Sequence, residues 1–314
     1  MITKAVVMSE PGNLSVRPVE LRNISKDDVV IEINYSGIST GTEKLFWNGK
    51  MPQFPGMGYP LVPGYESTGE VVQAPDDSSL KIGDMVFVPG ANCYSGSIKS
   101  LFGGAARRIF SAPNRLIKID STMGCNGALF ALAATARHAI AGFGNKMPDV
   151  IVGHGVLGRL LARLVILAGE KPPIVWEKNI LRHSGATDYE VVLPENDERS
   201  DYDCIFDVSG DSEILDSLIG RVQKGGEIVL AGFYPERLGF GFAQAFLKEV
   251  SLRVSAEFTP EDVVTTKLLI EDGSLSFDGL ISDVYSAQKA NEAYNIAFDN
   301  AECLKMVLDW RNAA

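Results

Sequence analysis

Polar and apolar residues alternate along the first part of the chain with the period of β-strands. Val29, Ile31 and Ile33 fall on alternate positions, which is the pattern of a strand with one buried face. Glycine and proline separate the apolar runs and predict turns between them. Strands are predicted at 1–8, 29–35, 66–74 and 84–88. Residues 51–64 contain too many prolines for a central strand and are predicted to form an irregular surface loop.

From about Gly124 the hydrophobic period changes, and helical segments alternate with short apolar runs. Helices are predicted at 124–143, 155–169 and 212–222, and strands at 149–153, 173–177, 189–192, 203–208 and 226–232. This alternation is typical of a doubly wound parallel sheet. After about residue 258 we expect a helix, a strand at 275–281, a helix at 287–298 and a last strand at 304–309.

These patterns divide the chain of 314 residues into three segments, and this length allows two substantial cores. Residues 1–119 are expected to form a β-rich domain and residues 120–258 a nucleotide-binding α/β domain. Residues 259–314 are expected to return to the first domain and complete it. The predicted fold class is therefore α/β, with a β-rich domain beside a doubly wound parallel sheet.

A glycine motif stands between the predicted strand at 149–153 and the helix that follows it. Gly153 permits a tight turn, Gly155 lets a pyrophosphate approach the backbone, and Gly158 lets helix and strand pack closely. The next strand ends in Glu177, where a carboxylate accepts hydrogen bonds from an adenosine ribose. A chance glycine turn is the alternative, which this context disfavours. The residues expected to bind the dinucleotide here are Gly153, His154, Gly155, Val156, Leu157, Gly158 and Glu177.

The net charge of the chain limits the kinds of molecule that it is expected to bind. The net charge is −11, which argues against nucleic acid and anionic membranes. No apolar run is long enough to cross a bilayer, and the N-terminus has no signal-peptide core, so a cytoplasmic location is expected. The four cysteines and three histidines are scattered; we expect reduced thiols and no metal site.

Four motifs resemble signatures of the medium-chain dehydrogenase/reductase family. They are PLVPGYESTGEV at 60–71, KIGDMV at 81–86, DVSG at 207–210 and GGEIVLAG at 225–232. The resemblance covers nearly the whole chain and implies a GroES-like catalytic domain, a Rossmann domain and a C-terminal return. It also implies that Ser209, Gly210 and Gly232 lie near the nicotinamide of the cofactor.

The chain departs from this family at the positions of the catalytic zinc. The resemblance places Ser39 and Tyr65 where zinc-dependent members have cysteine and histidine, and Ala131 where an acid often stands. These side chains do not supply the nitrogen and sulfur ligands that zinc prefers. Only Cys93 lies in the region of the structural-zinc loop. We therefore expect a zinc-independent enzyme.

Without a metal, a base or proton relay must act near the reacting oxygen. The candidate catalytic residues are Tyr65, Glu66, Ser39, Thr40 and Thr42. Each has an ordinary alternative role: Tyr65 fills a cavity, Glu66 anchors an ion pair or hydrogen bond, and the hydroxyls cap turns. His138 lies on an alanine-rich helix and is expected to pack there, although its imidazole has a suitable pKa for catalysis.

At closer range, several long segments resemble members of this family that act on a tetrapyrrole, among them SGISTGTEK at 36–44 and CLKMVLDWR at 303–311. The resemblance implies oxidation of the 3-(1-hydroxyethyl) group of a bacteriochlorophyllide-type tetrapyrrole to 3-acetyl, in bacteriochlorophyll biosynthesis. A flat macrocycle needs an apolar cleft. The expected cleft walls are Trp47, Phe54, Met57, Tyr59, Tyr94 and Phe102, of which about half are expected to pack the core instead. Of the neighbours Arg107 and Arg108, at most one is expected to face a substrate carboxylate.

The expected cofactor is NAD, because the carboxylate of Glu177 repels the 2′-phosphate of NADP; Lys178 beside it weakens this preference. A zinc-free, NADPH-dependent quinone or enone reductase is the second hypothesis. A non-catalytic protein that binds a pigment or dinucleotide is the third. A homodimer is a further expectation, by analogy of fold.

Overall fold

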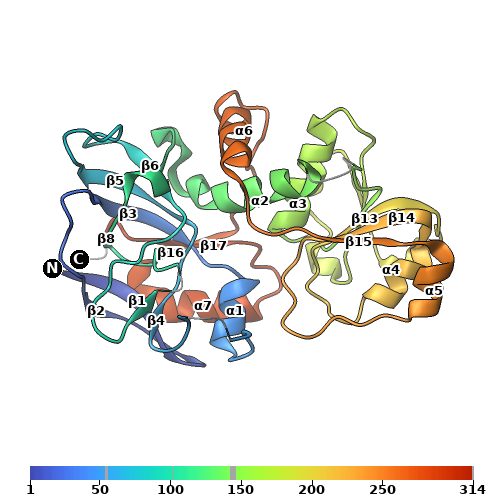
Figure 1. Ribbon diagram of the computed structural model, residues 1–314, viewed down its shortest axis with the longest axis horizontal. Coiled ribbons are helices and arrows are strands. Elements are labelled where there is room, and N and C mark those ends of the chain that lie inside the picture. The colour runs from blue at the N-terminus through green and yellow to red at the C-terminus, as the bar shows by residue number, and fades with distance from the viewer. Residues whose placement is uncertain (54–55, 101, 142–145, 313–314) are drawn as a thin grey trace. The chain divides into compact units, whose positions relative to one another are not determined.

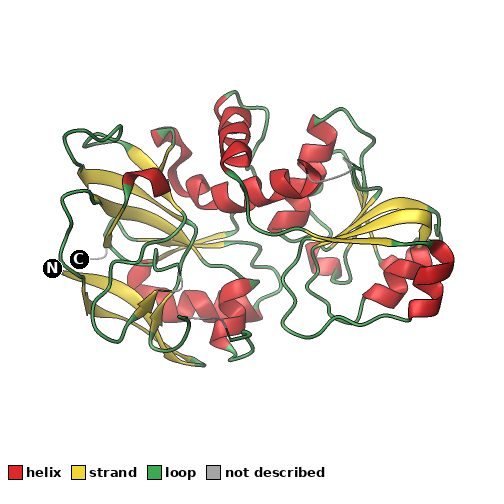
Figure 2. Ribbon diagram, viewed as in Figure 1, coloured by secondary structure: helices red, strands yellow, loops and turns green. Residues whose placement is uncertain are grey.

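The computed structural model describes residues 1–53, 56–100, 102–141 and 146–312. The chain forms two compact units. One consists of Met1–Ala131 and Phe277–Ala314, and the other of Leu132–Ser276. Figure 1 labels their helices and strands, and Figure 2 colours them by type.

The first unit contains two β-sheets. The four-stranded sheet has the order β2 (Asn13–Glu20), β1 (Ile2–Glu10), β4 (Leu61–Val62), β7 (Lys99–Ser100). The seven-stranded sheet has the order β16 (Asp283–Ser286), β17 (Met306–Asp309), β3 (Val29–Gly37), β5 (Ser67–Gln73), β6 (Met85–Val88), β9 (Ile117–Lys118), and β8 (Arg108–Ser111) also pairs with β3. The helices are α1 (Thr42–Trp47) and α7 (Ala290–Asp299), with 3₁₀ turns η1 (Pro113–Arg115), η2 (Ser121–Leu129) and η5 (Ala287–Lys289). The four strands predicted in this region are confirmed as β1, β3, β5 and β6.

The C-terminal segment joins this sheet, because β17 runs antiparallel to β3 with Leu308 opposite Ser36. The strand predicted at 275–281 is wrong: the strand lies later, at β16. The alternation of Leu275 and Phe277 resembles a strand, but both side chains are buried in a segment without a ladder. The segment predicted as an irregular loop at 51–64 contains the two-residue strand β4.

The second unit is built on a six-stranded parallel sheet. Its order is β12 (Glu190–Val192), β11 (Ile174–Trp176), β10 (Val150–Val152), β13 (Tyr202–Asp207), β14 (Val222–Leu230), β15 (Ser251–Val254). The helices are α2 (Phe130–Ala141), α3 (Val156–Leu167), α4 (Leu215–Arg221), α5 (Phe242–Lys248) and α6 (Pro260–Glu271), with 3₁₀ turns η3 (Ile180–Arg182) and η4 (Pro194–Asn196). The helix α3 covers one face of the sheet, and α4 and α5 cover the other (Figure 1). This is the strand order of the dinucleotide-binding fold, so the predicted fold class is confirmed.

The two units divide at positions that differ from the expected domain boundaries of 119/120 and 258/259. The first division follows Ala131. The turn η2 stays with the first unit because it packs closely there: a Cβ on Gly127 would lie 2.5 Å from Cγ2 of Thr68. The second division follows Ser276.

Side-chain contacts explain why α6 belongs to the second unit. Nδ1 of His138 on α2 lies 2.7 Å from Oδ2 of Asp262 on α6. The guanidinium of Arg163 on α3 donates to the backbone oxygen of Ser276. His138 therefore has the packing role expected of it. Among the helices of the described residues, none is long and apolar enough to cross a membrane.

Candidate active site and dinucleotide site

Three hydroxyl-bearing residues of the first unit meet where β3 ends and β5 begins. The antiparallel ladder sets Ser36 opposite Ser67, so the segment leaving β3 lies beside the segment entering β5. Ser39 Oγ and Tyr65 Oη are 2.7 Å apart, and the backbone N–H of Thr42 donates to Ser39 Oγ over 3.2 Å. Ser39, Tyr65 and Thr42 are called the hydroxyl group below.

The surroundings of Tyr65 keep its phenol neutral. Burial raises the pKa of Tyr65 well above its ordinary value, and the negative charge of Glu66 raises it further. A phenol with a raised pKa stays protonated, so it is a poor base and keeps an O–H that can donate a hydrogen bond. Thr40 is half-buried, and none of the hydrogen bonds found for this group within the described residues involves it.

Glu66 lies behind the hydroxyl group in an ion pair. Its carboxylate pairs with the ammonium of Lys305, and the exposed fractions of the two residues are 0% and 2%. The ammonium also donates to the backbone oxygen of Ile38 over 3.1 Å. Of the two roles that the sequence leaves open for Glu66, this geometry favours the ion-pair anchor. Lys305 was missed in the sequence, although a lysine next to the apolar run 306–308 is an unusual signal.

A second buried carboxyl, Glu43, lies on α1 directly after Thr42. Its Oε2 accepts a hydrogen bond of 2.7 Å from Tyr294 on α7, and its Oε1 has no partner among the described residues. Burial raises the pKa of Glu43 to about 8, and the charge of Glu66 contributes to the rise. Glu43 is therefore largely protonated at neutral pH. Glu43 lies within the segment 36–44, whose pattern predicts no role for its carboxyl.

The residues at the positions of the catalytic zinc do not fit a zinc ion. Ser39 and Tyr65 bind each other, and Ala131 is buried with no ligand atom. Within the described residues, no group of three or more histidine, cysteine, aspartate or glutamate side chains is placed to hold a metal. Hydroxyl oxygens are not the nitrogen and sulfur ligands of protein zinc sites.

The aromatic residues expected to line a cleft have different environments. The ring of Phe102 lies edge-on to Tyr65, with 4.9 Å between centroids, and is 39% exposed. Trp47, Met57 and Tyr59 are half-buried and pack against the core. Phe54 lies outside the described residues.

Tyr94 does not line a cleft, because it is buried and its hydroxyl donates to the backbone oxygen of Gly103. The two arginines do not point in opposite directions as a strand would require, whereas the prediction that at most one of them faces a substrate carboxylate stays a prediction. Arg107 and Arg108 both pair with the carboxylate of Glu32, because Arg107 precedes β8 and the alternation of a strand does not separate them.

In the second unit, the glycine loop has the form that a pyrophosphate requires. A side chain at position 158 would clash with the loop, because its Cβ would lie 1.9 Å from the backbone oxygen of Gly153. Glycine at this position therefore allows α3 to pack against the loop. Gly155 is the N-cap of α3 and has open space around it. The free N–H groups of the first turn of α3, at Val156 and Leu157, are a suitable anion site.

Glu177 follows β11 beside this loop. Its carboxylate accepts hydrogen bonds from the backbone N–H groups of His154 and Asn179, over 3.0 and 2.8 Å. His154 was expected to line the cofactor groove, but its side chain is fully buried. Its Nδ1 and Nε2 contact the Arg182 oxygen and the Tyr189 hydroxyl, and burial lowers its pKa to about 4. The imidazole is therefore a neutral support for the loop after β11.

The remaining dinucleotide candidates lie at the same edge of the sheet. Ser209 and Gly210 follow β13, and a Cβ on Gly232 would lie 3.3 Å from the Gly210 nitrogen. The buried carboxylate of Asp207 holds this end together, because it accepts hydrogen bonds from the Ser209 N–H and the Tyr234 hydroxyl. The structure thus brings the predicted residues together at the carboxyl ends of β10, β11, β13 and β14, where such sheets bind nucleotides. These residues fit a nicotinamide dinucleotide.

Comparison with known proteins agrees with this architecture. Residues 25–121 match the alcohol dehydrogenase GroES-like domain. L-idonate 5-dehydrogenase from Escherichia coli has a TM-score of 0.84 and 22% identity, and 98% of each chain is covered. A zinc-binding dehydrogenase from Sinorhizobium meliloti, solved with NADP, has a TM-score of 0.81 and 21% identity over 98% of this chain and 99% of its own. At these identities the solved structures show the fold alone.

The chain belongs to the medium-chain dehydrogenase/reductase family, and it is an oxidoreductase of that family. Within the family it is similar over its full length to two bacteriochlorophyllide dehydrogenases. The 2-desacetyl-2-hydroxyethyl bacteriochlorophyllide A dehydrogenase of Rhodobacter capsulatus is 56% identical, with 100% of each chain covered. The protein of the same name from Cereibacter sphaeroides is 54% identical, again with 100% of each chain covered.

The buried carboxyl of Glu43 generates a prediction about stability and pH. Its pKa in the folded protein is about 8, above that of an unfolded glutamate. The folded state therefore binds more protons between these two values, and its stability falls as pH rises through that window. Glu43→Gln removes this titration. The free energy of unfolding of the variant, relative to that of the parent chain, should therefore increase as the pH is raised from about 5 to about 9. Urea denaturation of both chains at the two pH values measures the difference, and a difference independent of pH would contradict it.

Proposed function

We propose that this protein oxidises the hydroxyethyl side chain of a bacteriochlorophyllide-type tetrapyrrole to an acetyl group, with NAD as the oxidant and without zinc. The reaction is the 3-(1-hydroxyethyl) to 3-acetyl step of bacteriochlorophyll biosynthesis, and we place it in the cytoplasm, where the dinucleotide is available. The observation that carries the proposal is the hydroxyl group at the position of the family's metal, in a chain 56% identical to a relative named for this substrate.

Ser39, Tyr65 and Thr42 can together carry away the proton of the substrate's alcohol group without a strong base. The glycine loop at 153–158 and Glu177 would hold NAD, which would supply the acceptor for the hydride of the carbinol carbon. The alcohol O–H gives its proton to Tyr65 Oη while Tyr65 gives its own proton to Ser39 Oγ, 2.7 Å away. The phenol stays neutral in this exchange, as its raised pKa requires. In the same step Ser39 gives its own hydroxyl proton toward solvent, while the N–H of Thr42 holds its oxygen in place.

The substrate itself reduces what the protein must supply. The carbinol carbon is attached to an aromatic macrocycle, whose π-system shares the positive charge that develops as hydride leaves. Phe102 offers an exposed ring beside Tyr65 against which a flat pigment can pack. These features support a reaction in which hydrogen bonds replace the Lewis acid that other family members use.

The central experiment mixes the purified protein with the hydroxyethyl bacteriochlorophyllide and NAD and follows the absorbance of pigment and NADH. We expect the long-wavelength band of the pigment to shift as NADH forms. Tyr65→Phe should lower kcat by about 100-fold, the order of a general acid–base contribution, with binding of NAD unchanged. Tyr285→Phe, a half-buried tyrosine of β16, is the matched control and should keep full activity.

Other outcomes of this assay decide between the alternatives. Reduction of quinones or enones with NADPH, in place of pigment oxidation, would show the second hypothesis to be correct. A shift of the pigment spectrum without any turnover of NAD or NADP would identify a non-catalytic binding protein.

Glu177 supports NAD over NADP, because its carboxylate lies beside the glycine loop where the ribose is expected. Lys178, which follows it, is paired with Asp211 over 2.6 Å. Glu177→Gln keeps hydrogen-bonding capacity and removes the charge. The ratio of Kd for NADP to Kd for NAD should then fall by about tenfold, since like charges at a binding site weaken affinity. Glu190→Gln, an exposed glutamate on β12, should leave the ratio unchanged, and a parent chain that prefers NADP would contradict the proposal.

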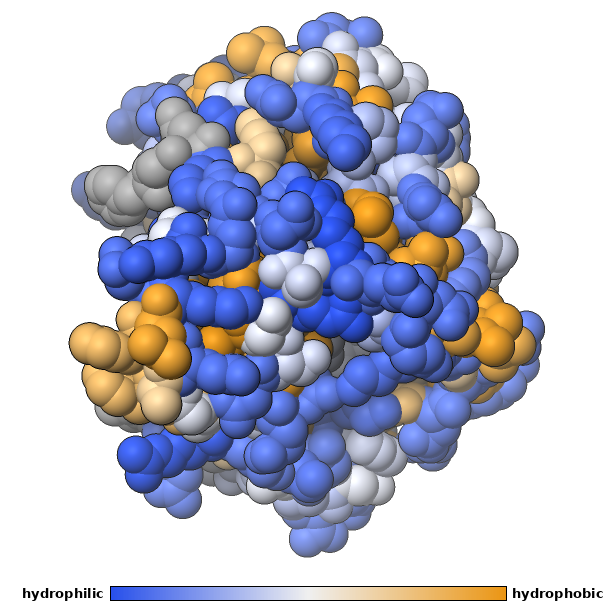
Figure 3. Space-filling view, turned by 90° about the vertical axis from the view of Figure 1, so that its right-hand side faces the viewer, coloured by the Kyte–Doolittle hydropathy of each residue, from blue (hydrophilic) through white to orange (hydrophobic). Residues whose placement is uncertain are grey.

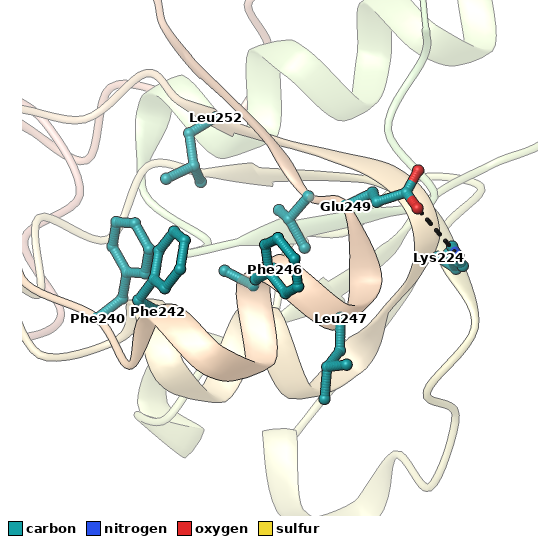
Figure 4. A pocket seen from close by; sticks show the side chains of 9 residues that line it. Lys224, Phe240, Phe242, Phe246, Leu247, Glu249 and Leu252 are labelled. Carbon is teal, nitrogen blue, oxygen red and sulfur yellow. Dashed lines mark ion pairs between the residues drawn. The ribbon is translucent and has the colours of Figure 1, made fainter.

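The proposed assembly is a homodimer formed through the edge strand β15. Helix α5 beside β15 exposes large apolar side chains, with Phe242 70%, Phe246 65% and Leu247 71% exposed, and Val254 on β15 is 76% exposed. Figure 4 shows the side chains of Phe242, Phe246 and Leu247 lining a pocket, and Figure 3 shows hydrophobic patches within a largely hydrophilic surface. The edge of β15 also has backbone groups without a neighbouring strand in the described sheet. A second copy related by a two-fold axis would supply the same edge and the same apolar patch.

Sedimentation velocity at micromolar concentration tests this assembly. The parent chain should sediment as a dimer. Val254→Lys should produce monomers, because a charge then lies in the apolar interface. Val264→Lys, at a 59% exposed position on α6, is the control and should remain dimeric. A parent chain that is monomeric would show that this surface has another use.

A further inference from the structure

The least expected feature of the first unit is an ion pair without access to water. Glu66 and Lys305 are 0% and 2% exposed, and Oε1 of Glu66 has no partner among the described residues. Removing such charges from water costs more than their attraction commonly returns, so a buried pair is weak evidence of a stabilising role. The pair therefore calls for another explanation.

The contacts of Lys305 supply that explanation. Its ammonium binds the side chain of Glu66 and the backbone oxygen of Ile38. Ile38 immediately precedes Ser39, and Glu66 immediately follows Tyr65. One side chain thus links the two segments whose hydroxyls meet 2.7 Å apart.

The backbone around the ion pair is shaped to admit it. The N–H of Gly37 donates to the backbone oxygen of Glu66, and the N–H of Ile38 donates to that of Met306. A Cβ on Gly37 would lie 2.6 Å from Oε2 of Glu66 and 3.0 Å from Cε of Lys305. Only glycine at position 37 leaves room for the carboxylate and the lysine together.

A hydrogen bond between two neutral hydroxyls is individually weak, and the backbone ladder that brings the two segments together does not fix where their side chains lie. We propose that Lys305 is a positioning residue for the oxidation, which bridges Glu66 and Ile38 and so fixes Tyr65 Oη against Ser39 Oγ. The lysine comes from the segment that leads into β17. The C-terminal return of the chain therefore holds the hydroxyl group in its reactive arrangement.

The test uses variants that keep the charges balanced. Lys305→Met alone leaves a buried unpaired carboxylate and destabilises the fold strongly. The double variant Glu66→Gln/Lys305→Met removes both charges and keeps similar side-chain volumes. Lys305→Arg is the conservative variant, since a guanidinium can still bridge a carboxylate and a backbone oxygen.

The first readout needs no substrate. Burial keeps Tyr65 from titrating with exposed tyrosines. In the double variant the backbone ladder remains but the lysine bridge is lost, so Tyr65 Oη should move away from Ser39 Oγ, and a spectrophotometric titration should show one more tyrosine ionising near its ordinary pKa of about 10. Glu66→Gln alone removes the same negative charge near Tyr65 but keeps the bond from Lys305 to Ile38, so it should not show the additional tyrosine. The additional tyrosine should be absent when Tyr65→Phe is added. An unchanged titration in the double variant would overturn the proposal, whatever substrate the enzyme uses.

The second readout rests on the proposed function. In protein shown to be folded by circular dichroism, the double variant should lower kcat by about 10-fold or more, while Kd for NAD stays the same. Lys305→Arg should restore most of the activity. Arg22→Met is the matched control, because it leaves the buried carboxylate of Asp28 unpaired in the same unit, away from the hydroxyl group. If Arg22→Met lowers kcat as much as the double variant, the effect is general destabilisation and the proposal fails.

Discussion

The backbone ladders on both sides of β3 set the position of every group in the hydroxyl site. One ladder joins β3 to β5 and places Ser39 beside Tyr65. The other joins β3 to β17 and delivers Lys305 behind them. Because a strand's side chains alternate, a shift of one residue in either register would turn these groups to the wrong face. The arrangement of the candidate catalytic side chains thus depends on backbone hydrogen bonds in which none of these side chains takes part.

The charges around this site are consistent with the proposed reaction, which uses no strong base. Two buried carboxyls, Glu43 and Glu66, lie near one ammonium. Glu43 responds by holding a proton, and Glu66 by pairing with Lys305. Both acids raise the pKa of Tyr65, which suits the neutral relay that we propose for its phenol. The resemblance to zinc-dependent members places metal ligands on these two segments; here, on our proposal, Lys305 links the two segments instead.

The sequence was most informative where function depends on neighbouring residues. The strand, glycine loop and helix around 149–169 lie within one short segment, so their geometry could be predicted from local spacing alone. The contacts that this segment makes with distant parts of the chain could not be predicted from local spacing. His154 was expected in the groove, but Tyr189 and Arg182, far along the chain, hold its ring inside the protein.

The first unit shows the same limit more strongly. Lys305 and Tyr294 complete the site from more than half the chain away, and no periodicity connects them to Ser39 or Glu43. Tyr94 is an aromatic residue of the kind that lines apolar clefts, but the hydrogen bond from its hydroxyl to the backbone oxygen of Gly103 holds it in the core. Local pattern therefore predicted the elements and the dinucleotide loop, whereas burial and long-range pairing determined the roles of individual side chains.

The most direct test of the central claim is the metal content of active enzyme. The purified protein would be analysed by inductively coupled plasma mass spectrometry after its specific activity has been recorded. The account predicts full activity with far less than one zinc per chain, because Ser39 and Tyr65 bind each other and offer no zinc ligands. One zinc per chain, with activity that rises and falls in proportion to it, would contradict the account.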